Sequence, residues 1–232
     1  AEIKLSPEPL FSSLLRRAVA QLWGDDAVMR DFVEYVAPKL SSQLGHTTAK
    51  GGDFFLMKLA EASEAGSNDR VFAYQHDQSM RAHLVNGLFP VLHIAHTLQR
   101  WQAPQFRYYD DTVRRLFMAG YVLHDWLKLP AIETELTAHG LSHDRVNPVK
   151  DLVVVERIFR QWGEWLGLGD FLAPIGGMDS LLHDLIYIAC NTQIKWGTLR
   201  NLAALPMVLI PRVLSQERYL ALSAVFGMLV TR

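Results

Sequence analysis

Apolar residues recur at helical spacing along nearly the whole chain, and this periodicity is the strongest constraint on its fold. The first 23 residues carry a clear example, with apolar side chains three and four positions apart at Leu10, Phe11, Leu14, Leu15, Ala18, Val19, Leu22 and Trp23. Similar patterns predict further helices over 27–36, 53–64, 77–99, 110–128, 148–166, 180–193, 199–209 and 214–229. No internal repeat or Gly-rich phosphate loop interrupts them. The pattern predicts an all-α helical bundle with a single core.

Prolines and Gly-rich stretches mark where these helices should end. Asp25-Asp26 is expected to cap the second helix, Pro38 to close it, and Pro90 to kink or restart the helix over 77–99. Residues 41–52, 130–147 and 167–177 are predicted loops, and 65–75 a mobile loop. A chain of 232 residues is long enough for one sizeable core, so we expect a single domain over 1–232.

The composition excludes several classes of protein. The formal net charge is −1, whereas a free-standing DNA-binding protein is usually basic. A single cysteine, Cys190, excludes an intrachain disulfide framework and fits a reducing compartment. No apolar run is long enough to span a membrane, and the N-terminus does not have the pattern of a signal peptide. These features favour a cytoplasmic protein without a membrane partner.

Four His-Asp dipeptides occur in the chain, and one of them is placed for metal chemistry. His76-Asp77 has the pattern of a helix cap, and His143-Asp144 lies in a predicted loop. His124-Asp125 instead follows an apolar helical run, with Lys128 one turn later and Gly120 one turn earlier. Imidazole and carboxylate groups are the ligands that water-activating metals prefer. A solvated or capping pair is the alternative interpretation.

The His124-Asp125 pattern resembles the metal-dependent phosphohydrolases of the HD type. This resemblance implies a further histidine from an earlier helix, and His83 is the best candidate because Asn86 and Gly87 share its face. His93 and His96, three residues apart, favour a solvated face or a packed pair. HD sites are closed by a late aspartate, but no Asp follows Asp184 in this chain. The closing ligand is therefore Asp184, Asp179 or His183, or it is missing.

A longer set of residues is similar to one particular family. The residues concerned are Asp77-Gln78-Ser79-Met80, His83 to Leu88, Leu123 to Lys128, Asp184, and Asn191-Thr192-Gln193 to Gly197. Together they resemble the N-terminal HD region of the large subunit of type I-D CRISPR effector complexes. The resemblance covers most of the chain and implies an HD-domain-like fold. One departure is that no Asp stands near Ala224–Gly227 in the last helix, which puts a complete two-metal site in doubt.

The resemblance implies a nuclease that cleaves single-stranded DNA in antiviral interference, together with other subunits of the complex and its guide RNA. One or two divalent ions, Mn, Ni, Co or Mg, would be the cofactor. The implied catalytic residues are His124, Asp125 and Lys128, and the implied metal ligands are His83, His124, Asp125 and Asp184. Secondary candidates are His183, Asn191 and Gln193, while Lys128 and Lys195 would contact the substrate.

Two other functions are compatible with the same residues. An HD phosphohydrolase could act on nucleotides, or a degenerate HD fold could serve as a scaffold in a ribonucleoprotein complex. For the nuclease, candidate contacts to the DNA backbone are Arg114, Arg115, Lys195, Arg200 and Arg212, and the alternative for each is an ordinary solvated face.

Overall fold

A computed structural model of the chain describes residues 7–44, 79–142, 145–148, 150–191 and 213–230. The described part contains helices and no strand, which confirms the all-α prediction. The predicted helices 53–64 and 199–209, the loop 65–75, and the His76-Asp77 and His143-Asp144 pairs lie outside the described residues. No helix in these ranges is long and apolar enough to cross a bilayer.

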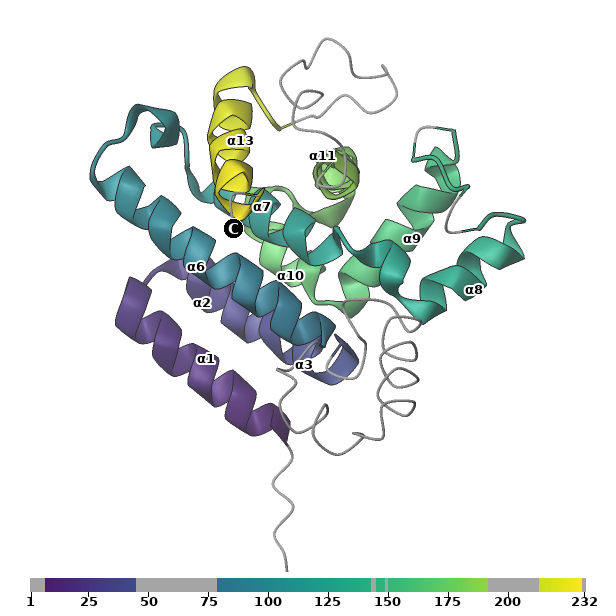
Figure 1. Ribbon diagram of the computed structural model, residues 1–232, viewed down its shortest axis with the longest axis horizontal. Coiled ribbons are helices and arrows are strands. Elements are labelled where there is room, and N and C mark those ends of the chain that lie inside the picture. The colour runs from purple at the N-terminus through teal and green to yellow at the C-terminus, as the bar shows by residue number, and fades with distance from the viewer. Residues whose placement is uncertain (1–6, 45–78, 143–144, 149, 192–212, 231–232) are drawn as a thin grey trace, which may run out of the picture.

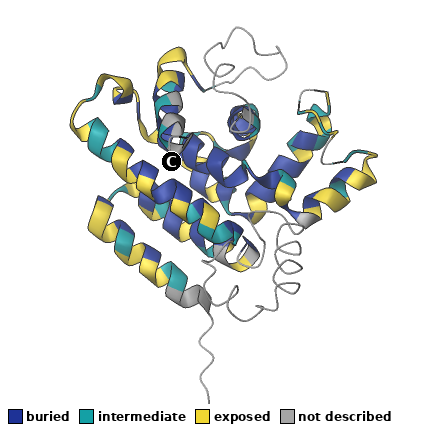
Figure 2. Ribbon diagram, in the orientation of Figure 1, coloured by how far each residue is buried: buried dark blue, intermediate teal, exposed yellow. Residues whose placement is uncertain are grey.

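The central element is α7 (Asp111–Leu123), which contacts α6 (Met80–Arg100), α9 (Leu152–Trp165), α11 (Gly177–Asn191) and α13 (Gln216–Val230). Figure 1 shows α7 in the middle of the molecule, with α6 and α13 on one side and α11 and α9 on the other. Every residue from Val113 to Leu123 is buried, and Figure 2 shows this central region in the colour of buried residues. A helix buried all round belongs to the interior of a domain rather than to its surface. The buried apolar residues of the described part form one cluster around it.

The N-terminal helices pack beneath α6. They are α1 (Pro7–Trp23), α2 (Ala27–Asp31), the π-helical segment η1 (Phe32–Val36) and α3 (Ala37–Leu44). Asp26 caps α2 as predicted, because its carboxylate accepts the Met29 N–H at 2.9 Å. The prediction that Pro38 closes this helix is wrong. The wide π turn just before Pro38 removes the clash that its ring would make with an α-helical carbonyl.

The predictions for the other proline- and glycine-rich segments also need correction. Helix α6 runs through Pro90 without restarting. The region 130–147 was expected to be irregular, but it begins with α8 (Pro130–Ala138), because Pro130 stands in the first turn, where no N–H is needed. The predicted loop 167–177 contains α10 (Leu168–Leu172) and the short η4 (Ala173–Ile175). Gly167 starts α10 in the left-handed conformation, with φ 75°, against the Tyr35 carbonyl.

Two arginines of α7 were candidate DNA contacts, and the structure instead buries them in ion pairs. Arg114 lies 2.7 Å from Asp26 and 3.2 Å from Asp111, while Arg115 pairs with Asp31 and donates to the Phe171 carbonyl. Their partners on α2 and near Phe171 are more than fifty residues away in sequence, so a local pattern could not identify them. These pairs attach α7 to the N-terminal helices and to α10.

Close packing of α7 on α11 depends on Gly120. A Cβ at this position would overlap the Cγ2 atom of Ile188 on α11. The glycine one turn before His124 therefore lets α11 approach α7 closely.

We expect the Gly120→Ala variant to lose about 1–3 kcal/mol of unfolding free energy, because overpacking outweighs the roughly 1 kcal/mol gain in helix propensity. Urea denaturation followed by circular dichroism measures the loss. Adding Ile188→Ala removes the overlap, so the double variant should lose less than the sum of the two single losses. Strictly additive losses would contradict close contact at this point.

Candidate metal centre

The candidate site forms where the start of α6 meets the end of α7. Ser79 caps α6, with its hydroxyl accepting the Ala82 N–H at 3.2 Å, and this places His83 in the first turn. His124 is the residue that ends α7, and Asp125 follows with φ −95° and ψ 21°. The sequence predicted one helix through Lys128, but the chain turns at the dyad and continues as η3 (Trp126–Lys128). This turn lets the neighbouring side chains of His124 and Asp125 point to the same place.

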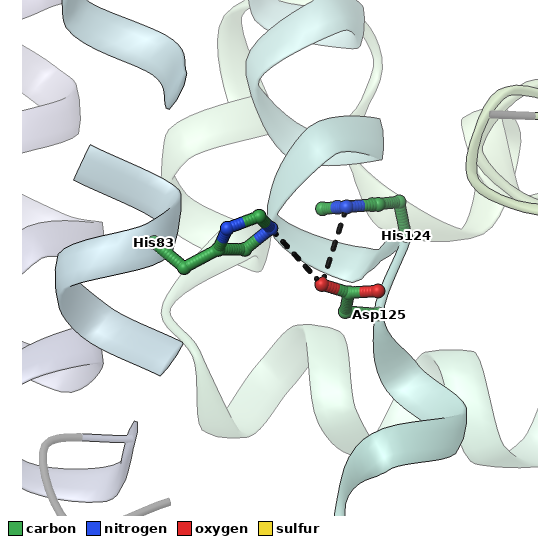
Figure 3. A group of neighbouring side chains, drawn as sticks. All are labelled: His83, His124 and Asp125. Carbon is green, nitrogen blue, oxygen red and sulfur yellow. Dashed lines mark ion pairs between the residues drawn. The ribbon is translucent and has the colours of Figure 1, made fainter. Parts of the chain in front are cut away.

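Three of the four predicted metal ligands converge. The Oδ2 atom of Asp125 lies 3.1 Å from Nε2 of His83 and 3.3 Å from Nε2 of His124, and Figure 3 shows both rings directed at this carboxylate. The three potential ligand atoms all lie within 4.8 Å of one another. Ligand atoms ~2.1 Å from a shared ion are separated by roughly 3.0–3.4 Å in octahedral or tetrahedral geometry. The His83–His124–Asp125 group therefore has a spacing that can hold a metal ion.

Among the described residues, one oxygen of the Asp125 carboxylate has no conventional hydrogen-bond partner. Its Oδ2 atom is buried and accepts no hydrogen bond of acceptable geometry from them, although two imidazole nitrogens lie nearby. The carboxylate borders a narrow, mostly apolar hollow lined by Leu123, Trp126 and Leu129. An ionised oxygen in such surroundings costs free energy unless a cation neutralises it. A divalent ion between Oδ2 and the two rings would satisfy this oxygen.

His124 is held in the protonation state that a metal ligand needs. A backbone carbonyl can only accept, so the contact of His124 Nδ1 with the Tyr121 carbonyl places the proton on Nδ1. The Nε2 lone pair is then directed at the carboxylate of Asp125. Burial lowers the pKa of His124 below its usual value and outweighs the attraction of Asp125. The ring is therefore neutral at physiological pH.

Tyr121 supports the same ring from the side, and sequence reasoning did not identify it. The rings of Tyr121 and His124 stack with centroids 4.6 Å apart and an interplanar angle of 18°. Gly87 makes room for this tyrosine, because a Cβ there would overlap the Tyr121 hydroxyl. Gly87, one turn from His83, therefore makes room for Tyr121, which in turn packs on His124. Tyr121 precedes His124 by three positions, and this helical spacing was the available signal.

Lys128 adds a positive charge beside the Asp125 carboxylate. Its ammonium lies 2.9 Å from Oδ1 of Asp125, on the opposite oxygen from the two histidines. Burial alone would raise the pKa of Asp125, but the contacts from His83, His124 and Lys128 outweigh it and lower the pKa to about 2. The carboxylate is therefore ionised at neutral pH. About a third of the Lys128 side chain is exposed, so its ammonium can also be reached from solvent.

The structure does not bring Asp184, the expected fourth ligand, to this group. Its side chain is fully buried, and Oδ1 accepts the backbone N–H groups of Val213 and Leu214 at 3.0 and 3.1 Å. The carboxylate thus holds the segment that leads into α13, and this placement replaces the expectation that Asp184 closes the metal site. The buried Asp184 carboxylate is thus hydrogen-bonded to backbone N–H groups.

The other predicted candidates lie elsewhere. His183 contacts Glu156 at 2.8 Å and Asp179 contacts Arg160 at 2.6 Å, so neither alternative closing ligand joins the three. His93 is exposed and packs edge-on against Trp23, which agrees with the predicted solvated face. The side chain of Asn191, and the whole of Gln193 and Lys195, fall outside the described residues. Within the described ranges, the potential metal-binding group consists of His83, His124 and Asp125.

Comparisons with protein-family models, with curated proteins and with solved structures gave no match for this chain. The HD-type arrangement and the relationship to type I-D CRISPR large subunits therefore stay predictions from the sequence.

The geometry predicts that the chain binds a divalent ion at the His83–His124–Asp125 group. Equilibrium dialysis against Mn²⁺, Co²⁺ or Ni²⁺ with metal analysis should find one ion at this group, lost in His124→Ala and in Asp125→Asn. An ion at one hundred times its Kd should add about 2.7 kcal/mol to the unfolding free energy. His139→Ala, which removes a histidine paired with Glu135, is the matched control and should bind normally. Equal metal binding by Asp125→Asn and the unsubstituted chain would exclude this site.

A second prediction separates a structural role of Asp184 from a ligand role. Asp184→Ala leaves one buried and one partly buried backbone N–H group without their acceptor, so we expect a loss of roughly 2–4 kcal/mol in unfolding free energy. Its metal stoichiometry should equal that of the unsubstituted chain. Loss of the bound metal with unchanged stability would instead make Asp184 a ligand.

Proposed function

We propose that this chain is a metal-dependent phosphoester hydrolase of the HD type. The observation that carries the proposal is the convergence of His83 Nε2, His124 Nε2 and Asp125 Oδ2, with the Lys128 ammonium on the other carboxylate oxygen. Two imidazoles and one carboxylate leave open coordination positions for water and substrate. A purely structural site would be expected to close all four positions.

A divalent ion bound there would polarise a phosphoryl oxygen and lower the pKa of a coordinated water. His83, His124 and Asp125 would hold the ion, and the Tyr121 carbonyl would keep the His124 proton away from it. Imidazole ligands favour transition metals, so Mn, Co or Ni fits this donor set better than Mg. Fe(II) also uses two histidines and a carboxylate, and belongs among the metals to be titrated.

Lys128 is the residue that would contact the phosphate in this proposal. Its ammonium is partly exposed and lies beside the carboxylate that would carry the metal. A fixed cation at this point offsets negative charge that develops on a phosphoryl group during hydrolysis. We assign Lys128 this role, and assign none to Arg114 and Arg115, whose side chains are buried in ion pairs.

The substrate we propose is single-stranded DNA, by resemblance to the type I-D large subunits. On the same basis the partners would be other subunits of the effector complex and its guide RNA, and the compartment would be the cytoplasm. The absence of a membrane-spanning helix among the described residues is compatible with this setting.

We expect the purified chain to cleave single-stranded DNA with Mn²⁺, Co²⁺ or Ni²⁺ and to be inactive in excess chelator. His124→Ala and Asp125→Asn should lower the rate at least about a hundredfold, because both remove metal ligands. Lys128→Ala should lower kcat by about ten- to a hundredfold while metal binding persists. His139→Ala serves as the control with unchanged rate. Cleavage by the His124→Ala, Asp125→Asn double variant at the rate of the unsubstituted chain would refute the proposal.

One observation favours a second candidate, a non-catalytic scaffold with an HD-like fold. Asp184 is committed to backbone hydrogen bonds, so only three ligands are present in the described part of the chain. Metal analysis separates the two functions, because a scaffold would fold normally without binding an ion. A nucleotide phosphohydrolase would bind the ion but release phosphate or nucleoside from small nucleotides while leaving DNA intact.

A further inference from the structure

The turn between α6 and α7 displays aromatic and basic side chains to solvent. Trp101 is 77% exposed and Tyr108 is 45% exposed, although burial of either ring would be favourable. Arg100 and Arg107 are also exposed, and the Arg107 guanidinium lies 5.7 Å from the centre of the Tyr108 ring. We call Arg100, Trp101, Arg107 and Tyr108 the stacking surface. It lies at the opposite end of α6 from His83 (Figure 1).

The backbone holds this surface in a defined conformation. At the end of α6, the Gln102 and Ala103 N–H groups donate to the carbonyls of Gln99 and Leu98, at 2.9 and 3.0 Å. These bonds form a Schellman motif, and Gln102 adopts φ 55° at the position that usually takes glycine. Gln102 is the one non-glycine residue with positive φ in the described ranges. Trp101 therefore extends from a helix end whose backbone conformation is defined by hydrogen bonds.

Buried residues anchor the rest of the turn. Phe106 and Tyr109 are buried and pack edge to face with centroids 5.7 Å apart. The Gln99 side chain donates to the Tyr109 carbonyl at 2.7 Å and joins the two ends of the turn. Because its neighbours on both sides are anchored, Tyr108 is presented to solvent by a packed turn between them.

The surface carries uncompensated positive charge. No carboxylate within the described residues forms an ion pair with Arg100 or Arg107. The nearest acidic residues in sequence are engaged elsewhere, because Asp110 contacts Arg218 at 2.8 Å and Asp111 contacts Arg114 at 3.2 Å. In a chain of net charge −1, this turn thus has an arginine next to each exposed aromatic residue in sequence, and the Arg107 guanidinium lies by the Tyr108 ring.

We propose that the stacking surface binds single-stranded nucleic acid, with bases stacked on Trp101 and Tyr108 and phosphates contacted by Arg100 and Arg107. Exposed aromatic planes interleaved with guanidinium groups are the recurrent means of binding single strands without sequence preference. The inference rests on the proposed function and deepens it by naming how the substrate strand is held. From His83 to Trp101 the helix rises about 27 Å, which a stacked strand spans in about eight nucleotides.

The test is binding of a fluorescent single-stranded DNA of at least about eight nucleotides by the Asp125→Asn chain in chelator, measured by anisotropy. This background prevents cleavage, so binding and the proposed hydrolysis can fail separately. Trp101→Ala and Tyr108→Ala should each weaken binding about tenfold, and Trp101→Ala should abolish most of the tryptophan quenching on binding. Trp165→Ala removes another exposed tryptophan, on α9, and should change nothing.

A salt titration distinguishes stacking from charge. Arg107→Gln should reduce the slope of log Kd against log salt concentration by about 0.7, whereas Trp101→Ala should leave the slope unchanged. Arg30→Ala, at an exposed arginine of α2, is the charge control.

The inference would be overturned if adding Trp101→Ala or Tyr108→Ala to the Asp125→Asn chain left its affinity for single-stranded DNA and RNA unchanged. An acidic protein partner would then remain as the occupant of this surface. If Trp101→Ala and Tyr108→Ala weaken binding but the unsubstituted chain does not cleave DNA with any of the metals, the inference is upheld and the proposed nuclease activity is refuted.

Discussion

The buried carboxylate of Asp125 is the group on which the rest of the site depends. It is contacted by His83 from the start of α6, by His124 at the end of α7 and by Lys128 from η3. Without these contacts its burial would disfavour the ionised form, whereas with them its pKa falls to about 2. The carboxylate therefore holds a negative charge inside the protein, and this charge defines where a cation can bind.

The packing of α7 supports this arrangement from behind. Gly87 admits Tyr121 between α6 and α7, and Tyr121 both stacks on His124 and accepts its Nδ1 proton in a hydrogen bond. Gly120 brings α11 against the same helix through Ile188. Gly87 thus supports the direction of the His124 ring through Tyr121, while Gly120 sets how closely α11 packs on the same helix.

Local sequence pattern predicted the features that depend on local structure. The helical period, the helix cap before α2 and the neighbouring positions of His124, Asp125 and Lys128 follow from spacing along the chain, whereas His83 was expected beside them only because of the HD resemblance. Pro38 and Pro130 misled the prediction because a proline marks a helix end or a helix start depending on the turn around it.

What the sequence could not supply were partners distant in the chain. A buried Asp184 on an apolar face has the same pattern whether its partner is an ion or the backbone of Val213 and Leu214. Arg114 and Arg115 have the pattern of a solvated or DNA-binding pair until Asp26 and Asp31 are placed beside them. Tyr121 acts mainly through its backbone carbonyl and ring plane, which no metal-ligand motif records.

The most direct test of the metal centre is a crystal structure of the chain soaked in Mn²⁺, with an anomalous difference map calculated at the manganese edge. A peak is predicted ~2.0–2.3 Å from Nε2 of His83, Nε2 of His124 and Oδ2 of Asp125, with open positions facing solvent. At saturating Mn²⁺, a map with no peak at these three atoms, or with the peak at the Asp184 carboxylate, would contradict the site described here.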